Sequence, residues 1–102
     1  MSRIDVTDAV QTLGQGESRP IAADGVEIAL CRGDSGVFAV ADLCTHAHAR
    51  LTDGFVLGDV IECPLHQAQY RLDTGELVEG PECPALQTYR LFEQEGRWYV
   101  ET

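Results

Sequence analysis

The sequence predicts an all-β fold, either an antiparallel β-sandwich or a β-barrel. Its apolar residues occur in short alternating runs, and groups rich in glycine and aspartate separate these runs. Only residues 8–13 have a weak helical pattern, which is enough for a single turn. Short strands joined by tight turns are typical of antiparallel sandwiches and barrels.

The strands can be placed from the turn signals between them. Asp24-Gly25 precedes the first clear alternating run, and Asp73-Thr74-Gly75 separates two later runs, as expected for hairpins. The last pair of strands flanks the polar residues 93–96. In chain order, the expected strands are residues 26–30, 37–40, 70–72, 76–78, 86–92 and 97–101.

Length and composition favour one small intracellular domain. The 102 residues, 44% of them apolar, suffice for one core, and no linker or repeat divides them, so we expect a single domain over residues 1–102. Residues 1–5 do not resemble a signal peptide, and no apolar run approaches the ~18–20 residues that cross a bilayer. The four cysteines then suit the reducing cytoplasm.

The net charge of −10 excludes two classes of partner. Nucleic acid and anionic membranes are bound by clustered cations, which this chain lacks. A basic protein surface is the natural complement of such a chain.

Two short motifs carry the chemistry of the sequence. Cys44 and His46 form a Cys-x-His pair, and Cys63 and His66 form a Cys-x-x-His pair. Thiolates and imidazoles suit iron-sulfur or zinc chemistry, whereas calcium and magnesium prefer oxygen ligands. One Cys and one His on each of two loops suits a two-iron cluster in which one iron takes both sulfurs and the other both nitrogens. A structural zinc site usually pairs like ligands, so the Cys-x-His pair fits zinc poorly.

These motifs resemble those of a known family. Residues 42–91 look like a Rieske ferredoxin, specifically the small bacterial ferredoxins that serve multicomponent aromatic-ring dioxygenases, and the similarity continues to the C-terminus and, more weakly, back to Arg3. The stretches that carry the resemblance are Cys44-Thr45-His46-Ala47, Leu51-Thr52-Asp53-Gly54, Glu62-Cys63-Pro64-Leu65-His66 and Gly80-Pro81.

The resemblance implies a fold, a cofactor and a role. It implies a Rieske fold whose cluster-binding portion, about residues 43–85, is inserted near one end, and one 2Fe-2S cluster held by four ligands: Cys44 and Cys63 on the buried iron, His46 and His66 on the outer iron. It implies a monomeric one-electron carrier, not an enzyme, which takes electrons from a flavin-dependent NADH reductase and passes them to a terminal Rieske oxygenase of aromatic hydrocarbon catabolism. No glycine loop for a dinucleotide is present, which agrees with a carrier.

Alternatives remain for the function and for single residues. A small Rieske subunit of a nitrite reductase would resemble this fold, and a zinc-binding interaction module could use the same ligands but would be colourless. His48 could replace His46 as a ligand, although the family spacing favours His46. Cys31 and Cys83 match no all-cysteine cluster spacing and are better interpreted as small apolar residues. Some Rieske proteins link the two loops by a disulfide, whose cysteines would fall at Ala49 and Leu65 here, so this chain lacks that link.

The residues around the motifs suggest how the centre is tuned and approached. Carboxylates bracket both loops, which predicts an acidic rim around a tip that is neutral or slightly positive through Arg50 and Arg71. The rim residues are Asp42, Asp53, Glu62, Asp73, Glu76, Glu79 and Glu82. In high-potential Rieske proteins a serine and a tyrosine after the second histidine donate hydrogen bonds to cluster sulfurs; here these positions are Ala68 and Tyr70. Tyr70 either makes that bond or only fills space.

Overall fold

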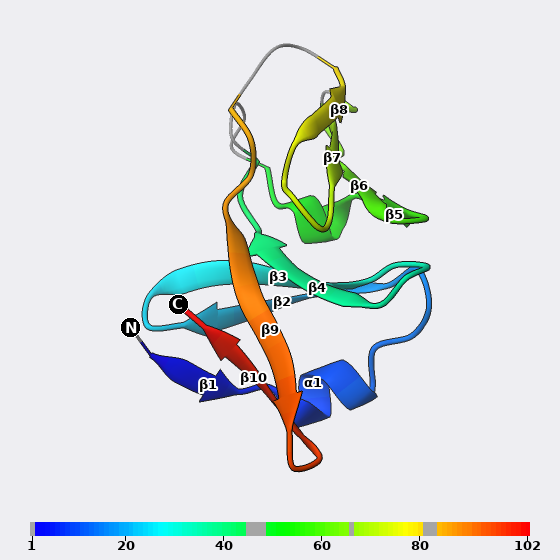
Figure 1. Cartoon of the computed structure of the whole chain (residues 1–102). Helices are drawn as coiled ribbons and strands as arrows, with labels where there is room; N and C mark the ends of the chain where they lie inside the picture. The colour runs from blue at the N-terminus through cyan, green and yellow to red at the C-terminus, as the bar shows by residue number, and fades with distance from the viewer. Residues whose placement is uncertain (1, 45–48, 66, 81–83) are drawn as a thin grey trace.

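The chain folds into two antiparallel β-sheets, one at each end of the molecule (Figure 1). The computed structural model describes residues 2–44, 49–65, 67–80 and 84–102. The larger sheet, here called the base sheet, has the strand order β1-β10-β9-β4-β3-β2. Its strands are β1 (Arg3–Asp5), β2 (Ser18–Ala23), β3 (Val26–Arg32), β4 (Val37–Ala41), β9 (Thr88–Gln94) and β10 (Arg97–Glu101). The predicted all-β antiparallel fold is confirmed.

The smaller sheet is an insertion between two strands of the base sheet. It has the order β5-β6-β7-β8 and is preceded by a short 3-10 helix, η1 (Leu51–Asp53). Its strands are β5 (Phe55–Leu57), β6 (Val60–Glu62), β7 (Gln69–Arg71) and β8 (Leu77–Glu79). The insertion leaves the base sheet after β4 and returns at β9, and these two strands pair directly through Val40 and Thr88. The expected inserted portion near one end of the fold is therefore present.

Two hairpins of the base sheet end in turns that the sequence signalled. Asp24 and Gly25 have φ angles of 53° and 77°, and Glu95 and Gly96 have φ angles of 53° and 79°. Positive φ at both central residues is the geometry of the two-residue turn that matches the twist of the flanking strands. Glycine adopts it without strain, which explains why the second turn position is glycine in both hairpins.

Four strands are absent from the sequence-based prediction. The chain also forms β1, β2, β5 and β6, and three of these span only three residues each. Strand β2 contains Pro20, which obscures its pattern but is tolerated because β2 lies at the edge of the base sheet. The weak helical signal at residues 8–13 corresponds to α1 (Thr7–Gln11).

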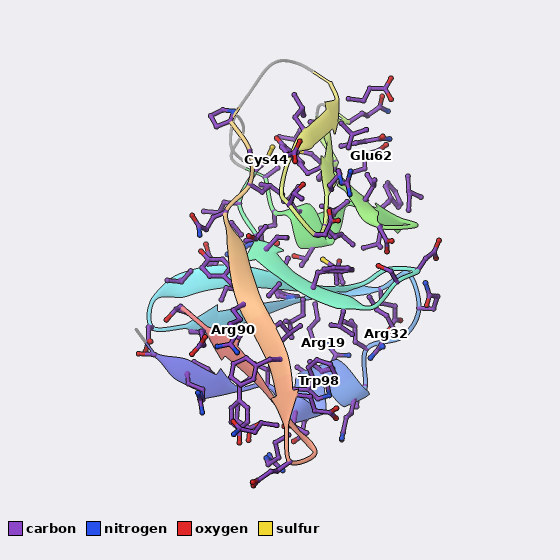
Figure 2. All side chains as sticks on the ribbon, viewed as in Figure 1. Arg19, Arg32, Cys44, Glu62, Arg90 and Trp98 are labelled. Carbon is purple, nitrogen blue, oxygen red and sulfur yellow. The ribbon has the colours of Figure 1, made fainter. Side chains whose placement is uncertain are left out.

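The described residues form two hydrophobic cores, of which the second joins the small sheet to β3 and β4 of the base sheet. The base core packs α1 against the base sheet and contains Val10, Ile28, Leu30 and Val100, all almost fully buried. Two arginines, Arg19 on β2 and Arg32 on β3, donate hydrogen bonds to the carbonyls of Ala9 and Leu13 at the C-terminal end of α1. Figure 2 shows these side chains, Arg19 and Arg32, in the half of the molecule that also holds Trp98. None of the described helices is long and apolar enough to cross a membrane.

Candidate metal centre

The first cysteine-histidine motif lies on a loop whose two ends pair with each other. The paired segments, residues 42–44 and 49–52, are here called the neck. Leu43 and Arg50 form an isolated antiparallel bridge, and the Cys44 N–H donates to the Ala49 carbonyl at 2.9 Å. The loop between Cys44 and Ala49 is here called the first ligand loop. Its residues 45–48, with His46 and the alternative ligand His48, lie outside the described residues.

The second motif lies on a loop closed in the same way. Strands β6 and β7 form a hairpin, beyond which the Cys63 N–H donates to the Ala68 carbonyl at 2.8 Å. Gln67 has a φ of 56° and donates its N–H to the Cys63 carbonyl at 3.1 Å, so the chain turns back sharply. The loop between Cys63 and Ala68 is here called the second ligand loop, and its His66 lies outside the described residues. Each loop thus begins at a cysteine whose N–H bonds to an alanine carbonyl five positions later.

Both cysteines point into one core, the small-sheet core. Cys44 is 6% exposed and Cys63 is fully buried. The other buried members of this core are Ala29, Cys31, Val40, Ala49, Leu51, Ile61, Ala68, Tyr70, Leu72 and Leu86. Apart from the cysteines, the tyrosine hydroxyl is the one polar side-chain group among these described members. Figure 2 places Cys44 at the end of the molecule that holds the small sheet.

The donor set of this core suits a soft metal. Two cysteine sulfurs from different loops lie among buried apolar side chains. Such surroundings exclude calcium and magnesium, which need oxygen ligands, and match the buried sulfur side of an iron-sulfur centre. The described residues therefore fit the cluster that the motifs predict.

The side chain of Tyr70 brings a polar group close to the first cysteine. It is fully buried on β7, and its hydroxyl lies 3.7 Å from the Cys44 Sγ. When Cys44 is a thiolate, the hydroxyl is the group that donates. The Tyr70 hydroxyl is thus directed at the Cys44 sulfur, as a tyrosine that bonds to the centre would be.

Two glycines hold neighbouring segments against the second ligand loop. A Cβ on Gly54, which follows η1, would lie 1.9 Å from the Glu62 carbonyl oxygen. A Cβ on Gly80, whose φ is 120°, would lie 2.8 Å from the Ala68 Cα. Both distances are too short for any side chain, so only glycine lets the chain pass here. These are the glycines of the Leu51–Gly54 and Gly80-Pro81 motifs, which explains their place in the pattern.

The charges near the loops differ from the expectation in two ways. Arg50 pairs with Glu27 and Asp42, and Arg71 pairs with Asp73 at 2.9 Å, so neither arginine leaves the tip positive. Hydrogen bonds that Arg50 donates to Glu27 and then to Asp42, together with the charges of these carboxylates, raise the pKa of Arg50. Asp42 is fully buried and cannot belong to an exposed rim, whereas Asp53, Glu76 and Glu79 are exposed and Glu62 is half-buried. Glu82 lies outside the described residues.

The exposed apolar side chains gather at the same end of the molecule. The large apolar residues that are exposed among the described ones all belong to the inserted portion or its neck. They are Leu43, Phe55, Leu57, Leu65 and Val78. Leu43 adjoins Cys44, and Leu65 lies within the second ligand loop. The sequence analysis missed this clustering, because exposure cannot be distinguished from burial in single apolar residues.

The two other cysteines do not belong to the Cys-x-His and Cys-x-x-His motifs. Cys31 lies on β3 with its side chain fully buried. Burial, with a smaller contribution from the charge of Asp42, raises the pKa of the Cys31 thiol to about 12. A thiol that stays protonated is a poor metal ligand, which supports its interpretation as a small apolar residue. Cys83 lies outside the described residues.

Comparison with known proteins agrees with this geometry. The family model for the Rieske [2Fe-2S] domain matches residues 4–90. The ferredoxin component of the naphthalene 1,2-dioxygenase system of Pseudomonas aeruginosa is 36% identical over 81 residues, which are 79% of this chain and 78% of that protein. A chain in the complex of reduced oxygenase and oxidized ferredoxin of carbazole 1,9a-dioxygenase superposes with a TM-score of 0.86 at 31% identity, covering 96% of this chain and 91% of that chain.

A third relative bears on the alternative function. A protein from Mycobacterium tuberculosis, assigned as an NADH-dependent nitrite reductase small subunit, superposes with a TM-score of 0.81 at 25% identity, covering 97% of this chain and 93% of that chain. The shared fold is clear, but the sequence agreement is weaker than with the dioxygenase ferredoxins, which disfavours the nitrite reductase alternative. The chain therefore belongs to the Rieske [2Fe-2S] family and is a ferredoxin of the dioxygenase type, an electron-transfer component that carries one Rieske-type 2Fe-2S cluster and is not itself a catalyst.

Proposed function

We propose that this ferredoxin carries single electrons from a flavin-dependent NADH reductase to the terminal oxygenase of an aromatic-ring dioxygenase system. The observation that carries the proposal is the pair of matching loops, which bring Cys44 and Cys63 into one apolar core beneath an exposed apolar surface. The relatives named as ferredoxins of dioxygenase systems, one of them in complex with the oxygenase, support the oxygenase as a partner.

The ligand assignment belongs to this proposal. Cys44 and Cys63 bind the inner iron as thiolates, and His46 and His66 bind the outer iron through their imidazoles. A Rieske cluster supplies one-electron redox chemistry at a potential that two imidazole ligands raise above that of an all-thiolate centre. The apolar side chains of the small-sheet core keep water away from the two sulfurs, and the Tyr70 hydroxyl donates to the Cys44 sulfur.

The inserted portion also supplies the docking surface. Leu43 precedes the first cysteine-containing motif and Leu65 lies within the second, and they are exposed by 49% and 60%. An apolar centre with carboxylates such as Glu76 and Glu79 at its margin is the composition of a transient protein interface. The partner surface that fits it is apolar at its centre and basic at its margin.

The wider setting follows from the same role. We propose that the chain acts as a monomer and as one domain over residues 1–102, with residues 43–85 as its cluster-binding portion. The cytoplasm supplies NADH to the reductase and keeps thiolate ligands reduced, so we place the protein there.

A reconstituted system tests the proposal. Reductase, oxygenase and NADH are mixed with an aromatic substrate, and product formation is measured with and without this chain. The proposal requires that product formation depend on the loaded chain, and that a Cys63→Ser variant without cluster fail to replace it. If the protein contains its cluster but product forms equally well without it, the oxygenase receives its electrons by another route and the proposal is wrong.

A further inference from the structure

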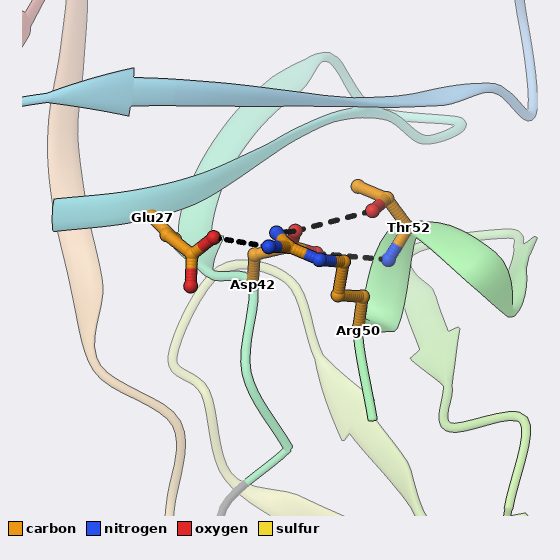
Figure 3. Close-up of polar contacts among 4 residues, drawn as sticks. All are labelled: Glu27, Asp42, Arg50 and Thr52. Atoms are coloured by element: carbon orange, nitrogen blue, oxygen red, sulfur yellow. Dashed lines mark hydrogen bonds and ion pairs between the residues drawn. The ribbon is translucent and has the colours of Figure 1, made fainter. Parts of the chain in front are cut away.

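A buried carboxylate joins the two arms of the first ligand loop. Asp42 precedes the loop and is fully buried, with a relative exposure of 0%. Its Oδ1 accepts a hydrogen bond from the Thr52 N–H at 2.9 Å, and its Oδ2 accepts from the Thr52 hydroxyl and from the Arg50 guanidinium, each at 3.2 Å. Figure 3 shows the carboxylate between these two residues of the returning arm.

The main chain closes the same neck. The Leu51 N–H donates to the Asp42 carbonyl at 2.6 Å, next to the bridge between Leu43 and Arg50. Asp42 therefore holds residues 50–52 through its side chain and its backbone together. The two ends of the first ligand loop are fixed at one place.

The neck is also anchored to the base sheet. The Asp42 N–H donates to the Glu27 carbonyl on β3 at 3.1 Å, and the Glu27 carboxylate pairs with the Arg50 guanidinium. Arg50 thus bridges a buried carboxylate and a surface carboxylate, as Figure 3 shows. Glu27 therefore attaches both Asp42 and Arg50 to the base sheet.

Energetics make this arrangement specific. Burying a carboxylate is costly unless its oxygens are hydrogen-bonded or paired with a cation, and here three donors meet that need. If the carboxylate is replaced, the half-buried Thr52 loses the acceptor of its N–H and its hydroxyl, and the exposed Arg50 guanidinium loses its link to the neck. Asp42 and its donors therefore act as a unit that joins residue 42 to residues 50–52.

We propose that Asp42 is a positioning residue that preforms the first ligand loop for the cluster, with Arg50 and Thr52 as its partners. The proposal rests on the ligand assignment made above. It gives this chain, which has no cysteines at positions 49 and 65 to link the loops, a different means of fixing the first one. Asp42 acts on the metal only through the placement of Cys44 and the residues that follow it.

Iron release from the loaded protein tests this role. Asp42→Asn keeps the side-chain shape but loses the charge that Arg50 needs, and we expect a chelator to remove iron about tenfold faster than from the parent, since a hydrogen bond to a charged group is being lost. Thr52→Val, which removes the hydroxyl, should also release iron faster than the parent. Thr52→Ser keeps the hydroxyl and should release iron at the parental rate. The reduced EPR spectrum of Asp42→Asn should also shift, because the ligands are held differently.

Two control variants separate positioning from general stability. Val100→Ala creates a cavity in the base core, far from the neck, and lowers global stability without touching the loop. Asp53→Asn removes an exposed carboxylate next to Thr52. If Asp42→Asn releases iron no faster than Val100→Ala at equal unfolding free energy and keeps the parental EPR spectrum, the proposal is overturned.

The remaining outcomes are also decisive. If Asp42→Asn does not fold, Thr52→Val and Arg50→Gln carry the same comparison, because both partners are only partly buried. Hydrogen exchange over residues 42–52 needs no metal, and it must be faster in the neck variants than in Val100→Ala. Failure of the proposed function has another signature, namely a parent protein without two irons and two sulfides.

Discussion

The Tyr70 hydroxyl lies 3.7 Å from the Cys44 Sγ, and both side chains are buried. Such a hydroxyl stabilises negative charge on the sulfur, and the reduced centre carries one more electron than the oxidised one. The bond should therefore strengthen on reduction and raise the potential.

Tyr70→Phe tests this effect. The strengthening is worth ~1 kcal/mol out of the ~1–3 kcal/mol of such a bond, and 59 mV corresponds to ~1.4 kcal/mol for one electron, so the potential should fall by about 40 mV. Protein-film voltammetry measures it, with iron content as a check on the fold. Tyr99→Phe, on β10 in the base sheet, is the matched control and should leave the potential unchanged. Equal potentials for Tyr70→Phe and the parent would show that the hydroxyl does not affect the centre.

The ligand assignment predicts unequal roles for the three histidines. His46→Ala and His66→Ala should each abolish the native cluster, whereas His48→Ala should keep two irons and two acid-labile sulfides. Iron and sulfide analysis, together with the visible spectrum, measures the outcome. A requirement for His48 in place of His46 would contradict the assignment, and one zinc without sulfide in protein from iron-replete cells would contradict the cofactor.

The exposed apolar residues predict where the oxygenase docks. Leu65→Ala should lower the second-order rate of electron transfer about five- to thirtyfold, because an apolar anchor at an interface centre is worth ~1–2 kcal/mol. The potential and iron content should stay at the parental values. Phe55→Ala is the control, since β5 lies at the outer edge of the small sheet in Figure 1. Stopped-flow transfer rates that fall equally in both variants would argue against docking centred on the ligand loops.

The exposed carboxylates predict a salt-dependent encounter. Glu76→Gln combined with Glu79→Gln should lower the transfer rate at low ionic strength and flatten its dependence on salt, because long-range attraction to a basic partner is reduced. Glu93→Gln with Glu95→Gln makes the same change of charge in the β9–β10 turn region, at the opposite end of the molecule. A rate that does not respond to ionic strength in the parent would remove these carboxylates from the docking mechanism.

The pairing of Asp5 with Arg97 predicts how the fold responds to acid. A hydrogen bond from Arg97, followed by those from Thr7, holds the pKa of Asp5 well below its usual range. Since the folded-state pKa is the lower one, the pair stabilises the fold above the unfolded pKa of ~3.9, and this contribution is lost as the pH falls below it. Urea unfolding of the parent and of Asp5→Asn should differ by a constant amount above pH ~5 and converge in more acid solution. Arg97→Gln should converge with the parent in the same pH range.

The sequence predicted the fold where local signals were strong. The turn at Asp24-Gly25 was placed correctly, because positive φ leaves few choices of residue. The Glu95-Gly96 turn lies within the expected residues 93–96, although β9 extends to Gln94. Strand β2 was missed because Pro20 marks an edge only once the neighbouring strand is known. Strands β5 and β6 are three residues long, which is too short for an alternating pattern to be distinguished from a loop.

The site was predicted less evenly than the fold. Spacing located the cysteines, and the structure brings Cys44 and Cys63 into one core as expected. The burial of Asp42 could not be foreseen, because aspartate is usually exposed and its donors lie at positions 50 and 52, beyond the loop. The neutralised Arg50 was missed for a related reason, since its partner Glu27 comes from a distant strand.

The pairing of β4 with β9 has a consequence for assembly of the protein. These strands are neighbours in the base sheet although almost half of the chain lies between Val40 and Thr88. Joining them in an unloaded chain costs the closure entropy of that long segment, which grows with the logarithm of its length. A metal centre that gathers residues from both ligand loops shortens the segment that is still free, so that loading the cofactor makes the distant β4–β9 contact easier to form. Binding of the cofactor and pairing of β4 with β9 are in this way thermodynamically coupled, even though β9 supplies none of the proposed ligands.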